Sequence, residues 1–307
     1  MSSFDVVGIG QVCVDYLGVV NRHPSVDERQ EITQLSTLRG GPTATALNVL
    51  SRFGLKVALV SKIGDDTEGK RLIQELEQES IDTTHLIVEP GKKTQVSLIP
   101  IEKHSGKRTV FWSRGTTTPL TAADIPTDIL QNTHAVHFDD LYAGAALRAI
   151  EAVGKEGLTV SFDAGEYNEA VEYARGDVDI LIASVDFMKS YSGGDDPRKC
   201  LEKMSEFGAA VIAITLGDRG SITSCGGEII DTPAYNVSAV DTTGAGDVFR
   251  GAFLYGRLMG WEVEESLPFA SAAAAMNTLS LGATGGIPES PEAVFAFMKS
   301  HETRPVK

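Results

Sequence analysis

The chain has 307 residues, and 27 lysines and arginines against 42 aspartates and glutamates give it a net charge of −15. This acidity argues against a protein that binds DNA, RNA or an anionic membrane surface, because phosphate groups favour clustered Lys and Arg. Hydrophobic residues make up 42% and charged residues 22% of the chain, a balance that excludes a disordered protein. Glycine is frequent, with 31 residues.

The three cysteines, Cys13, Cys200 and Cys225, are widely spaced and form no C-x-x-C pair. This spacing suggests neither a zinc site nor a disulfide framework. The segment MSSFDVVGIG lacks the basic and long apolar regions of a secretory signal, and no apolar run is long enough to span a membrane. We therefore expect a cytoplasmic protein without a membrane partner.

Short β-branched runs alternate with amphipathic helical segments through most of the chain. The predicted buried strands are Phe4–Gly10, Val57–Ile63, Ala135–Phe138, Thr159–Asp163, Asp179–Ser184 and Val211–Leu216. Helices are predicted over Thr67–Ser80, over Ala143–Lys155 and through most of the chain between Gly246 and Ser300. The alternation predicts a mostly parallel sheet with helices on both faces, and ligands beyond the carboxyl ends of its strands.

Two segments, about 12–38 and 94–113, interrupt this alternation with polar–apolar patterns and contain no good helix. QVSLIPI and RTVFW predict a hairpin whose turn contains Ser105 and Gly106. Because both segments leave the α/β core and return to it, we expect a small β-sheet lid on a single domain of residues 1–307. Exposed edges of such a lid favour a homodimer through strand pairing.

Three motifs are weighed and set aside. Gly64–Arg71 has the G-x-x-x-x-G-K spacing of a phosphate-binding loop, but Arg71 replaces the hydroxyl that would ligate magnesium, so an N-cap is the better interpretation. Gly8-Ile9-Gly10 lacks the third glycine of a dinucleotide fingerprint, which also counts against an NAD-dependent dehydrogenase. His134 and His137 face opposite sides of a strand and cannot share a metal ion.

The segment DTTGAGDVFRGAF, residues 241–253, is a glycine-rich turn followed by a helical pattern. Backbone N–H groups at such a helix start form an anion site, and small residues let a ligand approach. Asp247 is either a first-turn acid that favours the helix dipole or a base beside an anion hole. The residues alone leave both interpretations open.

The segment RGGPTATALNVLSRFG places a glycine pair before Pro42, which suits the first position of a helix that Gly54 ends. Asn48 is the polar residue of an otherwise small and apolar stretch. It is either a satisfied core amide or a group that binds hydroxyls.

Together these two segments resemble the signatures of the ribokinase-like (PfkB) carbohydrate kinase family. The resemblance extends over nearly the whole chain through IGDDTEGKRL, FDAG, ITLGDRGS and GATGGIP. It implies a three-layer α/β sandwich with a mostly parallel central sheet and a β-sheet lid over the substrate. It also implies an ATP-dependent kinase, with Mg²⁺ and possible use of K⁺, that phosphorylates a primary hydroxyl of a sugar.

The resemblance also implies roles for particular residues. Asp247 would be the catalytic base, and Gly244, Ala245 and Gly246 would offer N–H groups to the migrating phosphoryl group. Sugar-binding residues would be Asp15, Gly41, Asn48 and Arg114, although Arg114 is equally well explained as a solvated surface charge. Thr215, Gly217, Gly220 and Asn277 would bind the nucleotide, and Asp241, Thr243, Ala283 and Gly286 would hold a monovalent cation.

Two departures from the family pattern concern the metal. The N-x-x-E motif is replaced by Ser184-Val185-Asp186-Phe187, so Asp186 would have to substitute or ATP and water would hold the magnesium. The FD-x-N run is Phe162-Asp163-Ala164-Gly165 and lacks its Asn.

Two alternatives remain beside the sugar kinase. A nucleoside kinase on the same fold would need an aromatic platform, for which Tyr16, Phe111 and Trp112 are the candidates. A non-catalytic sugar-binding regulator would not require Asp247 as a base.

Overall fold

The computed structural model describes residues 4–305. Its main sheet has ten strands in this part of the chain, in the order β14-β13-β12-β11-β10-β9-β1-β4-β5, with β6 pairing with β4. The strands are β1 (Phe4–Ile9), β4 (Val57–Gly64), β5 (Ile81–Asp82), β6 (Leu86–Glu89), β9 (Thr133–Asp139), β10 (Thr159–Ala164), β11 (Ile180–Ala183), β12 (Val211–Thr215), β13 (Ser221–Cys225) and β14 (Glu228–Thr232). All pairings are parallel except those that β13 makes with β12 and β14.

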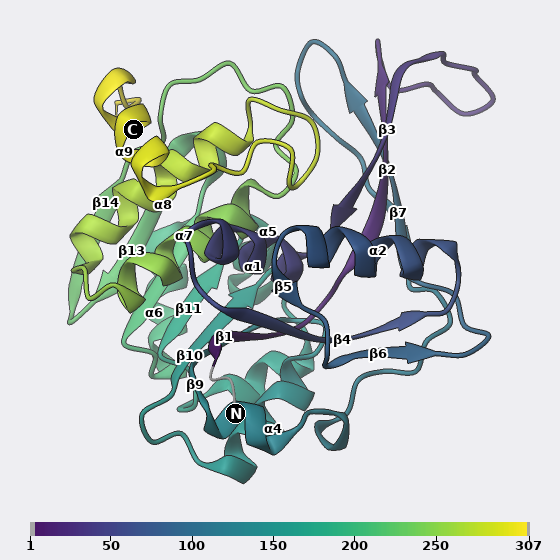
Figure 1. Cartoon of the computed structure of the whole chain (residues 1–307). Helices are drawn as coiled ribbons and strands as arrows, with labels where there is room; N and C mark the ends of the chain where they lie inside the picture. The colour runs from purple at the N-terminus through teal and green to yellow at the C-terminus, as the bar shows by residue number, and fades with distance from the viewer. Residues whose placement is uncertain (1–3, 306–307) are drawn as a thin grey trace.

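The central strands are apolar on both sides because helices cover both faces of the sheet (Figure 1). Neighbouring residues of β1 show this: Val6 packs into one hydrophobic cluster and Val7 into the other. The first cluster contains side chains of α1 (Pro42–Arg52), α2 (Thr67–Gln78), α7 (Ala245–Leu258), α8 (Val263–Asn277) and α9 (Pro291–Ser300). The second contains side chains of α3 (Thr127–Gln131), α4 (Ala143–Val153), α5 (Val185–Ser192) and α6 (Pro197–Met204). The predicted three layers are confirmed.

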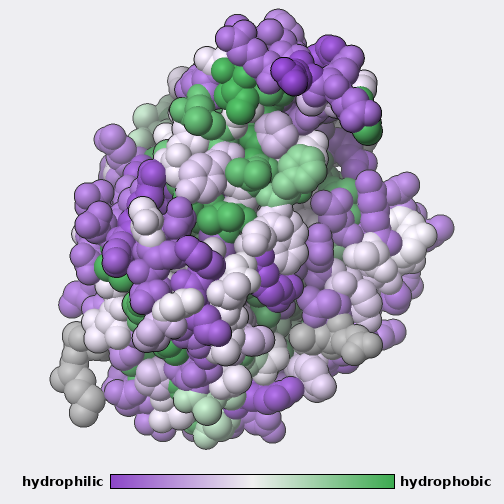
Figure 2. Space-filling model, turned by 90° about the vertical axis from the view of Figure 1, so that its right-hand side faces the viewer, coloured by the Kyte–Doolittle hydropathy of each residue, from purple (hydrophilic) through white to green (hydrophobic). Residues whose placement is uncertain are grey.

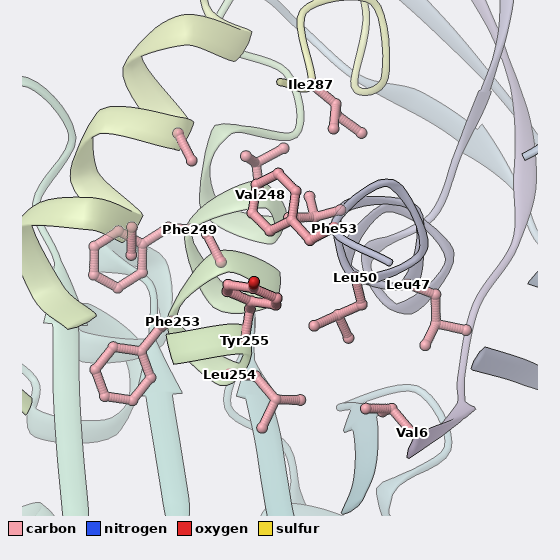
Figure 3. Packing of buried hydrophobic residues seen from close by; sticks show 14 of the residues in the cluster. Val6, Leu47, Leu50, Phe53, Val248, Phe249, Phe253, Leu254, Tyr255 and Ile287 are labelled. Carbon is pink, nitrogen blue, oxygen red and sulfur yellow. The ribbon is translucent and has the colours of Figure 1, made fainter. Parts of the chain in front are cut away.

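The first cluster joins the two helices that carry the sequence signatures. In Figure 3, Leu50 of α1 lies beside Tyr255 of α7, and these helices pack side by side over the sheet. Short 3₁₀ turns complete the described chain at Ala122–Asp124, Glu169–Ala174, Ser205–Phe207 and Gly217–Arg219. No helix within residues 4–305 is both long and apolar enough to cross a membrane.

The lid is a separate four-stranded sheet, β3 (Ile32–Gly40), β2 (Cys13–Val20), β7 (Val96–Glu102) and β8 (Phe111–Ser113). It rises from the main sheet at the upper right of Figure 1. Its strands lie in the two predicted segments, except that β3 extends beyond the first one to Gly40. Gly106 lies in the connection between β7 and β8 with a positive φ of 64°. The parallel pairing of β2 with β7 joins the two segments into one sheet.

The motifs set aside above have structural roles. Asp66 caps α2 by accepting a hydrogen bond from the Gly69 N–H at 3.1 Å, as the N-cap interpretation predicts. Gly8 lies inside β1, and no helix follows it directly. His134 is exposed while His137 is fully buried, so the two rings lie on opposite faces of β9.

Candidate active site

A cavity of about 920 Å³ lies between the lid and the carboxyl ends of the central strands. Residues just beyond β9, β10, β11 and β12 line it, among them Asp140, Gly165, Ser184 and Gly217. Alternate residues of the lid strand β2, such as Cys13 and Asp15, line the cavity from the other side. The cavity is therefore where a mostly parallel α/β sheet places its ligands.

The start of α7 forms one wall of this cavity. Gly244 is the N-cap, with a positive φ of 73° that few other residues adopt, and a Cβ there would lie 2.6 Å from the Cα of Ala283. Gly244, Ala245, Gly246 and Asp247 all line the cavity, as the sequence predicts. The first N–H groups of a helix have no partner within it, so this turn presents positive dipole ends to a bound anion.

Asp247 stands in the first turn of α7 with a half-buried side chain. Burial raises the pKa of its carboxyl group, and the positive charges of Arg250 and Arg108 oppose that rise. A carboxylate beside a ring of backbone amides can accept a proton while the amides stabilise charge that develops on a neighbouring group.

Arg250 lies one turn further along α7 and was not identified from the sequence. Its Nη1 is 3.6 Å from Oδ1 of Asp247, and its Nε is 2.7 Å from Oδ1 of Asp163 at the end of β10. The i, i+3 spacing of Asp247 and Arg250 places both on one helix face and is the signal that could have found it.

Asp15 projects from β2 into the cavity and is almost fully buried. Burial raises its pKa to about 6, while hydrogen bonds from Ser97 and Cys13 oppose that rise. The Cys13 thiol donates to Oδ1 of Asp15 at 3.3 Å, and Ser97 is the partner of Asp15 in the paired strand β7. Gly41 also lines the cavity.

Arg114 reaches the cavity from the segment after β8, with its guanidinium carbon 5.2 Å from the ring centre of Trp112. Arg108, also missed by the sequence analysis, lines the cavity and donates from Nη1 to the Thr242 hydroxyl at 2.6 Å. The lid thus contributes two guanidinium groups to the cavity of an acidic protein.

Of the three aromatic candidates, Trp112 lines the cavity and the other two do not. Phe111 is 60% exposed and pairs with Leu98 on the outer face of the lid. The Tyr16 hydroxyl donates to Glu68 of α2 at 3.1 Å. Because side chains alternate between the two faces of a strand, neighbours such as Phe111 and Trp112 cannot both face the cavity.

Asn48 does not line the cavity, contrary to the prediction that it binds the sugar. It is fully buried in α1 and accepts from Nη2 of Arg39 at 2.5 Å. Its Nδ2 donates to Oε2 of Glu79 at 2.8 Å. Both the oxygen and the nitrogen of the side-chain amide therefore bond to protein groups. This agrees with the alternative interpretation of Asn48 as a satisfied core amide.

The three glycine-loop residues predicted to bind the nucleotide, Thr215, Gly217 and Gly220, line the cavity. Asn277 does not, which corrects its placement near the adenine. It is fully buried at the end of α8, donates to the Thr243 carbonyl at 3.1 Å and accepts from the Gly286 N–H at 3.2 Å.

The four residues of the predicted cation site come together in two facing loops, but only Thr243 and Ala283 line the cavity. Oδ1 of Asp241 accepts from the N–H and hydroxyl of Thr243, at 2.9 and 2.7 Å. Its Oδ2 accepts from the Gly282 N–H at 2.8 Å. Asp241 and Gly286 thus stabilise the two loops, Gly286 through the hydrogen bond that its N–H donates to Oδ1 of Asn277.

The segment that departs from the N-x-x-E motif has a local explanation. The Ser184 hydroxyl caps α5 by accepting from the N–H groups of Asp186 and Phe187, both at 3.0 Å. Asp186 lines the cavity, so a carboxylate is present next to the position at which the family motif has Glu. Among residues 4–305, no group of three or more His, Cys, Asp or Glu side chains is arranged to hold a metal ion.

Comparison with known proteins agrees with this geometry. The profile of the pfkB family of carbohydrate kinases matches residues 3–290. A nucleoside kinase of Methanothermobacter thermautotrophicus is 29% identical over 301 residues, 95% of each chain. Ribokinase from Thermotoga maritima superposes with a TM-score of 0.81 at 27% identity, covering 96% of this chain and 99% of that one. Arabidopsis thaliana ribokinase, complexed with ribose and ATP, shares the fold with a TM-score of 0.79 at 22% identity, over 97% and 99%.

The match of the profile over nearly the whole chain, together with a cavity that unites both signatures, leads to one conclusion. The chain belongs to the pfkB family of carbohydrate kinases.

Proposed function

We propose that this kinase transfers the γ-phosphoryl group of ATP to a primary hydroxyl of a sugar or sugar derivative. The observation that carries the proposal is the position of Asp247 beside the N–H groups of the Gly244–Gly246 turn, in the wall of one cavity with Asp15. A base and an anion site in contact with one ligand space are the two elements that phosphoryl transfer requires.

In the proposed reaction the acceptor oxygen attacks the γ-phosphorus, and the bond to the β–γ bridging oxygen breaks. The hydroxyl proton passes to Asp247, and ADP leaves with the electron pair of the broken bond. The amides of Ala245 and Gly246 stabilise the negative charge on the transferred group, and Asp15 accepts hydrogen bonds from acceptor hydroxyls.

The nucleotide is proposed to lie along Thr215, Gly217 and Gly220. Magnesium prefers phosphate oxygens and water to an all-protein cage, so a metal that enters with ATP and touches Asp186 fits the acidic groups of this cavity. It would neutralise charge on the phosphates. A potassium ion held by carbonyl groups between the Thr243 and Ala283 loops belongs to the same proposal.

A nucleoside as acceptor is the second candidate, and Trp112 is the observation that favours it. Its side chain lines the cavity and is 55% exposed, so a base can stack on the ring. The nucleoside kinase of M. thermautotrophicus resembles this chain over 95% of its length, which supports the same candidate. ADP release measured over a panel of sugars and nucleosides, with and without potassium, separates the two.

The proposal predicts that Asp247→Asn folds normally and loses turnover by a factor of about 10²–10⁴, the usual contribution of a general base. The measurement is kcat for the best acceptor in the ADP-release assay, with thermal unfolding as the test of folding. Glu264→Gln, an exposed acid in the first turn of α8, is the matched control and should retain turnover. An Asp247→Asn protein with the wild-type kcat would refute the proposal.

We also propose a homodimer that forms through the lid. Its outer face exposes Ile32, Leu35, Leu98 and Phe111, each at least half exposed. Figure 2, which faces this side of the molecule, shows hydrophobic side chains among hydrophilic ones in its upper half. Contiguous apolar surface of this kind is typical of association sites.

A further inference from the structure

Arg250 connects two acidic side chains that come from different elements of the fold. We propose that Arg250 is a positioning residue, which holds the Asp247 carboxylate toward the acceptor and is itself anchored by Asp163 on the opposite side. This inference rests on the proposed function, because it assigns the arrangement that prepares the base.

The guanidinium of Arg250 is fixed by contacts at its Nε and Nη1 ends. Nε lies 2.7 Å from Oδ1 of Asp163 and 3.3 Å from the carbonyl oxygen of Ile182 in β11. Nη1 lies 3.6 Å from Oδ1 of Asp247. The side chains of Arg250 and Asp163 are only 4% and 3% exposed, so this pair is shielded from water. The guanidinium therefore has one position, and Oδ1 of Asp247 is directed toward it.

Gly246 makes this approach possible. A Cβ at this position would lie 2.5 Å from Nη1 of Arg250, and no other side-chain group except that guanidinium occupies the space. Glycine at 246 thus serves the guanidinium as well as the anion site. The small residue, the arginine and the acid are three parts of one arrangement on α7.

The charges of Asp163, Arg250 and Asp247 explain why Arg250 needs Asp163 to hold it in place. Asp163 is buried and its Oδ2 has no hydrogen-bond partner among the described residues. Burial raises the pKa of its carboxyl group, and the positive charge of Arg250 opposes that rise. The same guanidinium opposes the rise in the pKa of Asp247. Two acids therefore compete for one cation, and each also repels the other.

Other charged groups surround Asp247 and act on it more weakly or from further away. Arg108 faces it from the connection between β7 and β8, and lowers its pKa. Asp15 and Cys13 face it from β2, and Asp139 and Asp140 lie beyond Asp163 at the end of β9. Since these groups remain in place in variants of Arg250 and Asp163, differences between those variants report on the pair itself.

The arrangement predicts opposite effects for its two members. Loss of the Arg250 charge removes the attraction that favours ionised Asp247, so the pKa of Asp247 rises. Loss of the Asp163 charge removes a repulsion and leaves the guanidinium to Asp247 alone, so that pKa falls. A role of Arg250 and Asp163 in folding only would lower stability in both variants without separating the two pH profiles.

The test measures kcat against pH between about pH 5 and 9, at saturating ATP and acceptor, for wild type, Arg250→Met and Asp163→Asn. We expect the acid limb to move up by about one pH unit in Arg250→Met, equivalent to a tenfold loss of turnover on the limb, and to move down in Asp163→Asn. The KM for the acceptor should stay within about twofold, because the proposed function assigns the acceptor hydroxyls to Asp15 and not to these two side chains. Limbs that stay in place, or move in the same direction, overturn the inference.

The double variant Arg250→Met/Asp163→Asn guards against loss of folding, since it removes the buried pair without leaving a lone charge. Its acid limb should lie above that of Asp163→Asn, and a coincident limb contradicts the inference. Asp247→Asn, measured in parallel, separates the two hypotheses. If it keeps the wild-type kcat, the proposed function fails; if it loses kcat while the Arg250 limb does not move, only this inference fails.

Discussion

The carboxyl group of Asp15 is buried on the inner face of the lid, where hydrogen bonds from Cys13 and Ser97 reach it. Burial raises its pKa from 3.8 to about 6. The group is therefore ionised above that pH and neutral below it. An ionised carboxylate accepts hydrogen bonds from two hydroxyl groups, whereas the protonated form has lost part of that capacity.

The KM for the acceptor should therefore rise as the pH falls from 7 to 5, by up to about tenfold per pH unit below the pKa of Asp15. The value of kcat at saturating acceptor should change less, because it reports the complex in which Asp247 is the base. In Asp15→Asn the KM should be high at every pH. A wild-type KM that stays constant over this range would contradict the assignment of Asp15.

At this scale the sequence identifies residues that belong to a dense local motif. Asp247 and the Gly244–Gly246 turn stand in such a motif, and the structure places them in the cavity wall. The sequence analysis does not identify Arg250, because its partner Asp163 belongs to a strand far away in the sequence. The i, i+3 spacing marks Arg250 as a neighbour of Asp247, but the surrounding sequence does not show that its guanidinium is buried against Asp163.

Helix α1 shows how one polar residue joins elements. Asn48 connects Arg39, at the end of β3, with Glu79, the C-cap residue of α2. Arg39 is buried, and burial lowers its pKa to about 10, so the loss of a hydrogen-bond acceptor beside it is costly.

We expect Asn48→Ala to lower the free energy of unfolding by about 1–3 kcal/mol, the cost of leaving buried polar groups unpaired. The KM for the acceptor should stay within about twofold, because Asn48 does not reach the cavity. Chemical denaturation followed by circular dichroism gives the first quantity, and the ADP-release assay gives the second.

Thr45→Val is the matched control on the same helix face, since the Thr45 hydroxyl is buried without a hydrogen-bond partner among the described residues. It should be nearly neutral or slightly stabilising. A large rise in acceptor KM with unchanged stability in Asn48→Ala would restore Asn48 to the binding site.

Elements with strong patterns are predictable, and elements at the periphery are not. The six predicted strands and the helices at Thr67 and Ala143 are found close to their expected bounds. The hairpin of β13 and β14 is not predicted, because β14 is largely exposed and its alternation carries little apolar signal. The faces of Asn48 and Phe111 also depend on tertiary packing, which the pattern does not contain.

At the scale of the whole molecule, the outer face of the lid departs from an ordinary polar surface, because Leu35, Leu98 and Phe111 are exposed on it. We expect the wild-type protein to sediment as a dimer, and Leu98→Asp to shift it toward the monomer, because a charge at a contact between copies must be buried or repelled. Leu98 is exposed on the outer face in the middle of the sheet, next to Phe111.

Sedimentation velocity over a range of protein concentrations checks this expectation. Val26→Asp is the control, since Val26 is exposed in the connection between β2 and β3 and belongs to no strand. A wild-type protein that remains monomeric at the highest concentration would exclude the lid dimer.

The global fold follows from the alternation of strands and helices and from the resemblance, and the structure confirms both. The net charge of −15 describes the chain as a whole and does not show that positively charged side chains line its cavity. Arg108, Arg114 and Arg250 all line the cavity. Overall composition therefore argues against polyanion partners, while the placement of individual side chains determines the chemistry of the cavity.

The parallel pairing of β2 with β7 has a consequence for how the protein folds. Cys13 and Ser97, which approach each other in that pairing, are 84 positions apart, so the lid closes a long loop before its hydrogen bonds compensate the lost chain entropy. The lid side of the cavity is built from residues 11–114, and the phosphoryl-transfer side, residues 241–250, from a segment much later in the sequence. The cavity is therefore complete only when α7 has docked against the parts of the fold built from the earlier segment.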